Sequence, residues 1–550
     1  MVRPSRPHPV PARAEPGGGE CCPQAGGLRI PVTWQQHDVL LDALTHPGSG
    51  RHLEQLSWRW HGPLHTGRFT AAWQAVTDRE RVLRSAVAWR PVPHLVVHPG
   101  ARADVVRHRA GSITWQQLLE RDRRRGFDLH TPGPLRLTLL DDPPPVPGAT
   151  PQPAPDTLAR TTAGPAEGAA TAAAEGAGAK TVLAGGADAG AVADAGGPAT
   201  RVLLTFHHGL LDAVSVFVLL EEFYRAYLAG GALPGGQRRP DVGDWVHWLE
   251  GQDVAGAREL FAQIAPARAP VVLPAVAGPA TGERGCGRAE VHLSAAEAGR
   301  LHEWAAQRAL ADSTCLQAVW ALLLYRAVGV AGPAAVGFGV AVTGRGITLD
   351  AVERLPGPLR NVLPMSVEVD AAHRLQQLLG VLRERALDLA AYEWLPAAQV
   401  SAWTAPAGGR LMESLVAIEG TPRRFPARRA ALTAAGIRPG PVRASGAHSA
   451  LPLTLLAHRE DDGALRLAAL HDRSRLAAAD AALLLGHCAR LLRHLPATGP
   501  ATTVADVLAT LTGEPAPRAA PAHTRTPGAG RLPLYSITAR PAVEHIASRP

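Results

Sequence analysis

The sequence predicts an α/β protein made of two lobes of comparable size. Short β-branched or apolar runs alternate with longer amphipathic runs, and the alternation occurs with similar weight before and after about residue 270. Short apolar runs are typical of buried strands, and amphipathic runs are typical of helices with one buried face. The chain has 550 residues, of which 46% are hydrophobic, so it is long enough for more than one domain and apolar enough for sizeable cores.

Composition suggests where the ordered parts begin and end. Residues 1–27 and 513–550 are rich in Pro, Ala, Gly and Arg, and we expect a disordered leader and a disordered tail. Residues 141–200 are a low-complexity stretch with few large apolar side chains, so burial cannot offset their ordering entropy and a disordered insertion is predicted. The two lobes are then expected at 28–268 and 269–512.

The first lobe is predicted from an apolar pair of runs and a helix. The runs at 135–140 and 202–206 flank the insertion and are read as the strands of a hairpin whose loop has been expanded, because loop-closure entropy grows slowly with length. Upstream, Phe69, Trp73 and Val76 share one face of a predicted helix.

The second lobe is predicted to open with a helix capped by Ser294, with Glu297 completing a capping box. An almost wholly apolar helix follows at 313–328, and the Gly-rich, β-branched run at 333–344 is typical of a core strand. Further strands are expected at 362–370, 451–458 and 463–472, the last two joined by an Asp-Asp-Gly turn, and a closing helix ends at Leu495.

Charge and cysteine usage argue against several functions. The formal net charge is +8, but Lys180 is the only lysine, and the arginines are scattered and often lie beside acids, so nucleic-acid binding is not favoured. The five cysteines are irregularly spaced and no CxxC or Cys/His ligand pattern occurs, which argues against a zinc site and favours free thiols in a reducing cytosol. No run is long enough to span a bilayer and no secretory signal is present, so a cytoplasmic protein is expected.

A histidine pair marks the candidate site. His207 and His208 end the apolar run at 202–206, and Asp212 follows four residues after His208, where an amphipathic run begins. Asp212 and Ser215 are residue types that satisfy the free N–H groups of a helix start. Such a strand-to-helix junction can aim an imidazole into a cleft. On the alternative interpretation one histidine satisfies a backbone carbonyl and Asp212 is only a helix cap.

The pattern HHxxxD formed by these residues, together with its context, resembles the condensation domains of nonribosomal peptide synthesis, which are marked by HHxxxDG. The resemblance runs from about Leu28 to Leu495, and its segments occur in the family's order. The matching positions outside the histidine motif are Gln36, Glu80, Leu83, Arg84, Asp244, Trp245, Trp248, Arg345, Gly357, Asn361 and Pro364.

The chain departs from the family pattern at three places. Ala213 stands at the motif's glycine, Asp78-Arg79 replaces an Arg-His pair, and 392–396 keeps only the proline of its segment. Alanine suits a helix start, so we expect the loop to survive unless the glycine needed a positive φ. The departures at Ala213 and Asp78-Arg79 motivate one alternative, a catalytically inactive scaffold or interaction domain, against which the intact His207, His208 and Asp212 argue.

The resemblance implies two lobes, each like chloramphenicol acetyltransferase, that form a V-shaped pseudo-dimer with a central tunnel. It implies that acyl donor and acceptor arrive from opposite faces as thioesters on phosphopantetheine arms of carrier proteins, and that an amine attacks the donor thioester. His208 would accept the amine proton or orient the nucleophile. Asp212 would be architectural and pair with an arginine, Arg345 as first candidate and Arg84 as second.

Four further residues complete the predicted site. The N–H of Gly209 could approach a developing oxyanion, because no side chain stands beside it. Ser215 and Asn361 are supporting candidates, with His207 grouped among the catalytic residues. The plainer interpretation of each is a local hydrogen bond.

No adenylation or carrier segment stands out, so we expect a free-standing, monomeric enzyme of antibiotic or other secondary metabolite biosynthesis. Its expected partners are peptidyl or acyl carrier proteins in trans and a small-molecule amine, with no bound cofactor or metal, no nucleic acid and no membrane. A related acyltransferase that forms an ester or acylates a soluble acceptor is the alternative within enzymes, because the same imidazole serves either nucleophile.

Overall fold

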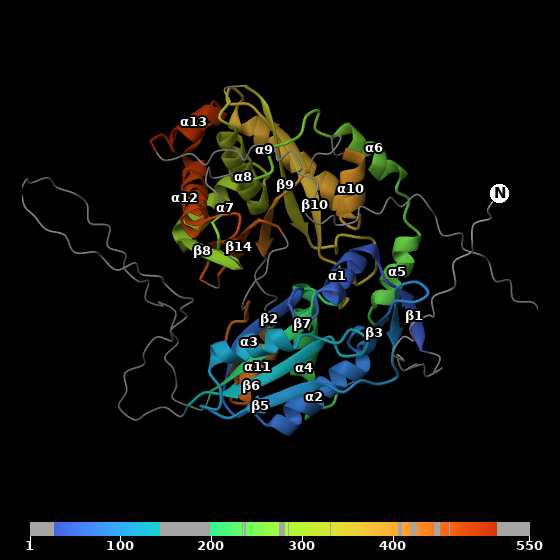
Figure 1. Cartoon of the computed structure of the whole chain (residues 1–550). Coiled ribbons are helices and arrows are strands. Elements are labelled where there is room, and N and C mark those ends of the chain that lie inside the picture. Colours follow the sequence, from blue (N-terminus) through green and yellow to red (C-terminus); the bar gives the residue numbers. More distant parts are fainter. Residues whose placement is uncertain are drawn as a thin grey trace, which may run out of the picture.

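The computed structural model describes residues 27–143 and 199–513, apart from 234, 236–237, 274–280, 284, 331, 405–409, 420–425, 445–450 and 461. Two α/β lobes lie one above the other (Figure 1), as the sequence predicts. The predicted leader, tail and nearly all of the insertion lie outside the described residues. No helix within the described ranges is long and apolar enough to cross a membrane.

The first lobe is built around a mixed sheet with strand order β12-β2-β7-β6-β5, and β13 also pairs with β2. A small sheet, β1-β4-β3, lies beside it. The elements of this lobe that come from the first half of the chain are β1 (Leu28–Pro31), α1 (Trp34–Thr45), β2 (Leu53–His61), α2 (Thr66–Arg79), β3 (Ser85–Ala88), β4 (His94–Val97), β5 (Asp104–His108), α3 (Trp115–Arg125), β6 (Leu135–Asp141), β7 (Ala199–His207), α4 (Ala213–Leu228) and α5 (Val242–Glu250).

Strands β6 and β7 form the predicted hairpin. They pair antiparallel, with Leu135 opposite Phe206 and Asp141 opposite Thr200. The ends of the predicted insertion are therefore strand, because Asp141, Ala199 and Thr200 belong to the ladder.

Aromatic packing fixes helices α2 and α4 on one face of the first sheet. Phe223 of α4 stacks on Trp73 of α2 with ring centroids 4.8 Å apart, and Trp60 of β2 packs edge-on to Phe69. Helix α3 covers the opposite face, where Leu118 contacts the sheet. The sheet is thus covered on both sides, which explains why β7 reads as a nearly continuous apolar run.

The second lobe has a sheet with strand order β10-β9-β11-β14-β15-β8, packed against helices α7, α8, α9 and α12. The predicted hairpin is present, with β14 antiparallel to β15. The elements from this half of the chain are α6 (Ala255–Gln263), β8 (Cys286–Leu293), α7 (Ala295–Ala306), α8 (Asp312–Val328), β9 (Ala334–Val342), β10 (Asn361–Val369), α9 (Leu375–Ala391), α10 (Ala397–Thr404), β11 (Ser414–Glu419), α11 (Pro426–Ala434), β12 (Arg438–Pro439), β13 (Arg443–Ala444), β14 (Leu453–Arg459), β15 (Leu465–Asp472), α12 (Ala478–His494) and α13 (Val504–Ala509).

The boundary between the lobes differs from the predicted one at residue 268. Helix α6 packs on α10, and its Ala257 and Phe261 are buried in the core of the second lobe. The second lobe therefore begins before α6. An amphipathic helix shows in sequence that one face is buried, but not which core receives that face.

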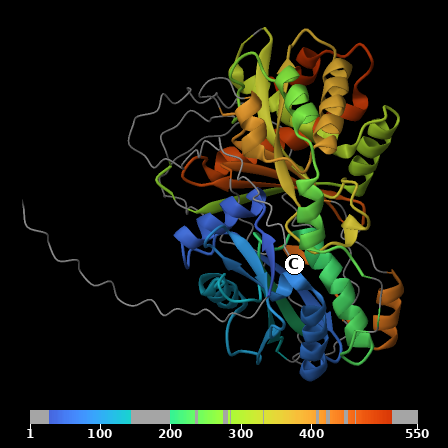
Figure 2. The ribbon, with the colours of Figure 1, turned by 90° about the vertical axis from the view of Figure 1, so that its right-hand side faces the viewer.

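A late segment of the chain returns to the first lobe, which the predicted division did not include. Strands β12 and β13 pair with β2, with Arg438 opposite His61 and Arg443 opposite Ser57. Leu432 of α11 is buried in the first core, and Figure 2 shows α11 beside α4. The two lobes are therefore joined by sheet hydrogen bonds as well as by the chain that connects them.

Candidate active site

The histidine pair lies at the junction of β7 and α4, where the sequence places it. His207 is the last residue of β7 and pairs with Leu53 of β2. The next residue, His208, has left the strand, but its backbone N–H still donates to the carbonyl of His52, 2.8 Å away. Strand β2 and the residue that precedes it, His52, therefore position the two histidines.

His207 is a buried, neutral side chain. It is only 2% exposed, and its Nδ1 accepts the backbone N–H of Gly209 at 3.1 Å. Burial lowers the pKa of His207 to about 3, and the nearby His52 and His208 rings contribute in the same direction. An imidazole that cannot be protonated near neutral pH and already holds the loop backbone has a structural role.

His208 is the accessible member of the pair. Its side chain is 33% exposed, and the carboxylate oxygen Oε1 of Glu54 lies 3.2 Å from its Nδ1. His208 is therefore the histidine that a substrate can reach.

Asp212 caps helix α4 from a fully buried position. Its side chain is 0% exposed and its Oδ1 accepts the backbone N–H and the hydroxyl of Ser215, at 2.8 and 2.7 Å. The hydroxyl oxygen of Ser215 in turn accepts the N–H of Gly357 at 2.8 Å. Asp212 and Ser215 thus form a cap that also reaches a segment of the second half of the chain.

Arg345 binds the same carboxylate from the other lobe. Its two terminal nitrogens lie 2.8 Å from Oδ2 and 3.0 Å from Oδ1 of Asp212. The backbone N–H groups of Leu359 and Arg360 donate to Oδ2 as well. Burial alone would raise the pKa of Asp212, but Arg345 and the bonds from Ser215 outweigh it and hold that pKa below its ordinary value.

Arg84, the second candidate partner, does not reach Asp212. It donates instead to the backbone carbonyls of His98 and Pro99 in the small sheet region. Sequence could not separate the two arginines, because both have the same charge and reach and only the lobe packing decides which one meets the carboxylate.

Two other predicted residues make local hydrogen bonds. The N–H of Gly209 is taken by His207 and so is not a free oxyanion donor. The side-chain amide of Asn361 donates to the carbonyls of Glu393 and Leu395. Gly209 is still needed for packing, because a Cβ there would come within 2.8 Å of the Leu40 side chain of α1.

Ala213, which replaces the family's glycine, fits its place. It is the first residue of α4 and has no positive φ. Its Cβ therefore causes no strain at the turn.

The sequence reasoning missed three residues around the histidines. His52 has a left-handed backbone (φ 58°), and its Nε2 lies 2.7 Å from Oδ2 of Asp42. Glu54 adjoins His208. One sequence signal could have identified Glu54. It is a carboxylate at the first of four alternate positions, and the other three are the buried residues Leu56, Trp58 and Trp60.

Comparison with known protein families shows to which family the chain belongs. Residues 198–498, more than half of the chain, match the condensation domain, so the chain belongs to the condensation domain family. A linear gramicidin synthase protein of Brevibacillus parabrevis is 25% identical over 410 residues, covering 71% of this chain and 4% of that protein. Chondramide synthase cmdD of Chondromyces crocatus is 24% identical over 403 residues, covering 71% and 9%. The chain thus spans only a small part of these relatives.

Solved structures share the fold. The first condensation domain of the CDA synthetase has a TM-score of 0.63 at 18% identity, covering 87% of this chain and 98% of that one. The X-domain from teicoplanin biosynthesis also has a TM-score of 0.63 at 18% identity, covering 88% and 98%. The predicted two-lobed α/β fold and the predicted membership of the condensation domain family are confirmed.

Proposed function

We propose that the chain forms an amide between a carrier-bound acyl or peptidyl thioester and an amine, with His208 at the reacting atoms. The observation that carries the proposal is that the three polar side chains at the β7–α4 junction differ in burial and in hydrogen bonding. His207 and Asp212 are buried and hydrogen-bonded, whereas His208 is accessible and has its backbone held by His52.

The chemistry would be acyl transfer from sulfur to nitrogen. The amine nitrogen attacks the thioester carbon, the C–N bond forms and the C–S bond breaks. The proton lost by the amine passes to the imidazole of His208 and from there to the departing thiolate. An imidazole, with an ordinary pKa near 6.5, can both accept and return a proton near neutral pH.

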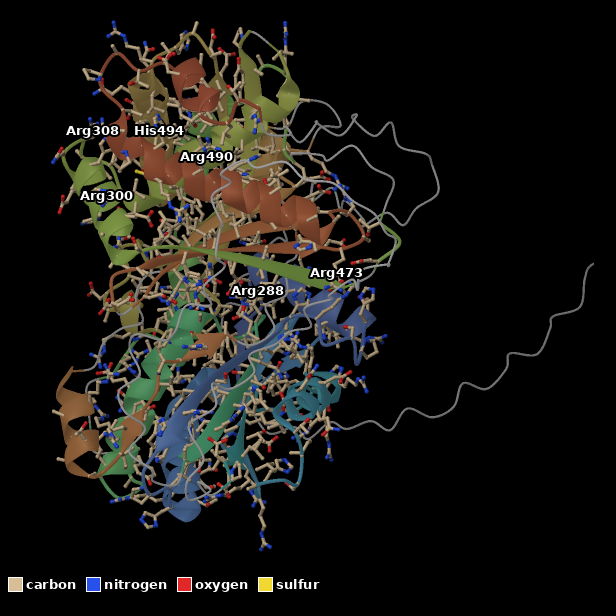
Figure 3. The ribbon with its side chains drawn as sticks, turned by 90° about the vertical axis from the view of Figure 1, so that its left-hand side faces the viewer. Arg288, Arg300, Arg308, Arg473, Arg490 and His494 are labelled. Atoms are coloured by element: carbon tan, nitrogen blue, oxygen red, sulfur yellow. The ribbon has the colours of Figure 1, made fainter. Side chains whose placement is uncertain are left out.

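Carrier proteins are the proposed partners, each presenting its substrate on a phosphopantetheine arm. A basic face on the second lobe would suit an acidic carrier surface. Figure 3 shows Arg288 and Arg473 at the lower edge of this face and other basic side chains above them, along α7 and α12. The two arginines lie near Glu290 and Glu283, so part of their charge is already neutralised. The members labelled in the figure are Arg288, Arg300, Arg308, Arg473, Arg490 and His494.

The departures from the family pattern that motivated the inactive-scaffold alternative each have a local structural role. Ala213 begins α4 without a positive φ. Asp78 accepts a hydrogen bond from Gln74 on α2, and Arg79 pairs with Glu222 at 3.2 Å. Asp78 and Arg79 therefore serve the packing of the first lobe and lie away from the Asp212 cap.

Intact-mass spectrometry of loaded carrier proteins tests the proposal. Acyl-loaded donor carriers and amine acceptors, free or carrier-bound, are mixed with wild type, His208→Ala or the exposed-histidine control His247→Ala. Wild type and control should transfer the acyl group, and His208→Ala should slow transfer by roughly 10²-fold or more.

Three results would count against this function. Equal transfer by wild type and His208→Ala would remove His208 from the reaction. No transfer by wild type across a panel of donors and acceptors would favour the scaffold. Transfer to a hydroxyl acceptor and not to its amine analogue would favour the ester-forming alternative.

A further inference from the structure

Glu54 contacts His208 on the side away from Asp212. The Nδ1 atom of His208 is shielded from solvent and makes no hydrogen bond of good geometry within the described residues, yet Glu54 Oε1 lies 3.2 Å away. A small rotation of either side chain would turn this contact into a hydrogen bond. A shielded imidazole nitrogen beside a carboxylate is an unusual arrangement unless the two groups share a proton.

The register of the sheet makes this contact. Glu54 lies directly opposite Phe206 in the β2–β7 ladder, and Phe206 is two residues before His208 in the chain. Side chains alternate along a strand, so Glu54 points to the same side as Leu56, Trp58 and Trp60. These three are buried in the apolar core of the first lobe. Continuing that alternation would put an apolar side chain at position 54, so the carboxylate departs from the local pattern where it meets His208.

His52, two residues before Glu54, holds the backbone of His208. His52 has a φ of 58°, a conformation that is unfavourable for a residue with a side chain and persists only where the surroundings impose it. Its ring is held by Asp42 of α1 at 2.7 Å, and its carbonyl accepts the N–H of His208 at 2.8 Å. The short stretch from His52 to Glu54 thus holds both the backbone and the ring of His208.

We propose that Glu54 is a positioning residue for His208: it holds the ring proton on Nδ1 and leaves Nε2 free to take the proton of the attacking amine. The assignment rests on the proposed function of His208. The carboxylate would also stabilise the imidazolium once the amine proton has been taken up.

Other charged groups around His208 act in different directions. Burial lowers the pKa of both His207 and His52, and His208 acts in the same direction on both, although Asp42 opposes this at His52. Arg123 of α3 interacts electrostatically with Glu54 and donates to the carbonyl of Gly50 and the side chain of Gln55. Glu54 brings a negative charge into contact with the His208 ring.

The test measures the pH profile of the reaction and the stability of each variant. Acyl transfer to an amine is followed by intact-mass spectrometry of loaded carriers across pH 5–9, and urea unfolding is followed by circular dichroism. Wild type is compared with Glu54→Gln, which keeps the shape and removes the charge, and with Glu54→Asp. Glu290→Gln is the matched control, since Glu290 has similar exposure (36% against 41%) and pairs with Arg288.

In Glu54→Gln the acid limb of the kcat/KM profile should move to lower pH, because a negative charge beside the reacting imidazole is lost. In the same variant kcat/KM at the plateau should fall about tenfold, because the ring is no longer held in one tautomer. Glu54→Asp should give smaller changes and Glu290→Gln none, and the urea midpoint should be the same in Glu54→Gln and Glu290→Gln.

An unchanged kcat/KM profile in Glu54→Gln, or the same change in Glu290→Gln, would overturn the assignment. A loss of transfer that comes with an equal loss of stability and no displacement of the acid limb would also overturn it, because Glu54 would then serve the fold and not the reaction. A wild type that transfers no acyl group to any acceptor would instead overturn the proposed function, and the assignment with it.

Discussion

Arg345 holds the Asp212 carboxylate with two hydrogen bonds, at 2.8 and 3.0 Å, and thereby ties the start of α4 in the first lobe to the chain that follows β9 in the second. Both side chains are nearly inaccessible, with exposures of 6% and 0%. Because the carboxylate is enclosed among protein donors, it braces the loop that carries His208.

Replacing Asp212 should strongly destabilise the protein. Asp212→Ala leaves Arg345 buried without its counter-charge, which typically costs about 3–5 kcal/mol. Urea unfolding followed by circular dichroism measures this change. Ser294→Ala is the control, because Ser294 caps α7 at the surface and its loss should cost only about 1 kcal/mol. Equal losses would mean that Asp212 acts as a cap alone.

The buried His207 should make stability depend on pH. The unfolded chain takes up this proton near pH 6.5, whereas the folded protein does so only near 3. Between these values the unfolded state binds more protons, so the free energy of unfolding is highest above pH 6.5 and falls on acidification by up to about 1.4 kcal/mol per pH unit. His52, whose pKa burial also lowers, adds a change of the same sign.

His207→Asn should flatten this dependence between pH 5 and 7, because asparagine keeps an acceptor for the Gly209 N–H but does not titrate. Urea unfolding at several pH values measures the slope, and His247→Asn, at an exposed position of α5, is the control. A slope that survives His207→Asn would assign the effect to other groups.

Gly344 should be much less replaceable than other glycines with positive φ. It has a φ of 67°, and a Cβ there would collide with the carbonyl oxygen of Leu359. Gly344 also directly precedes Arg345, which binds Asp212. Gly344→Ala should cost about 3 kcal/mol, from the left-handed backbone and from the forced displacement. Gly111→Ala, with a φ of 77° and open space around it, should cost about 1–2 kcal/mol. Similar thermal shifts for both variants would contradict this difference.

The long insertion should be dispensable for folding. Strands β6 and β7 pair up to Asp141 and Thr200, so their ends can be joined by a short Gly/Ser turn in place of residues 145–198. Shortening the connection should leave the free energy of unfolding unchanged or raise it by up to about 2 kcal/mol. An insoluble or unfolded product would show that the removed segment contributes to the fold.

Local sequence patterns predicted many of the helices and strands of this protein. The β6–β7 hairpin, the capping box of Ser294 and Glu297 and the helix that follows Asp212 all follow from short stretches of sequence, and the structure has each of them. The predicted boundary placed helix α6 in the wrong lobe, and the return of β12 and β13 to β2 was not predicted. Two-residue strands carry almost no periodic signal, and only their partner strand makes them part of a sheet.

The sequence by itself determined the strand-to-helix junction, the histidine pair on it and the family to which the ordered motifs point. Only the tertiary structure decided that His207 is buried and His208 accessible, that Arg345 and not Arg84 meets Asp212, and that Glu54 adjoins His208. The physical reason is that burial and ion pairing depend on which elements come together across the two lobes and on the register of β2 against β7, and residue spacing along the chain records neither.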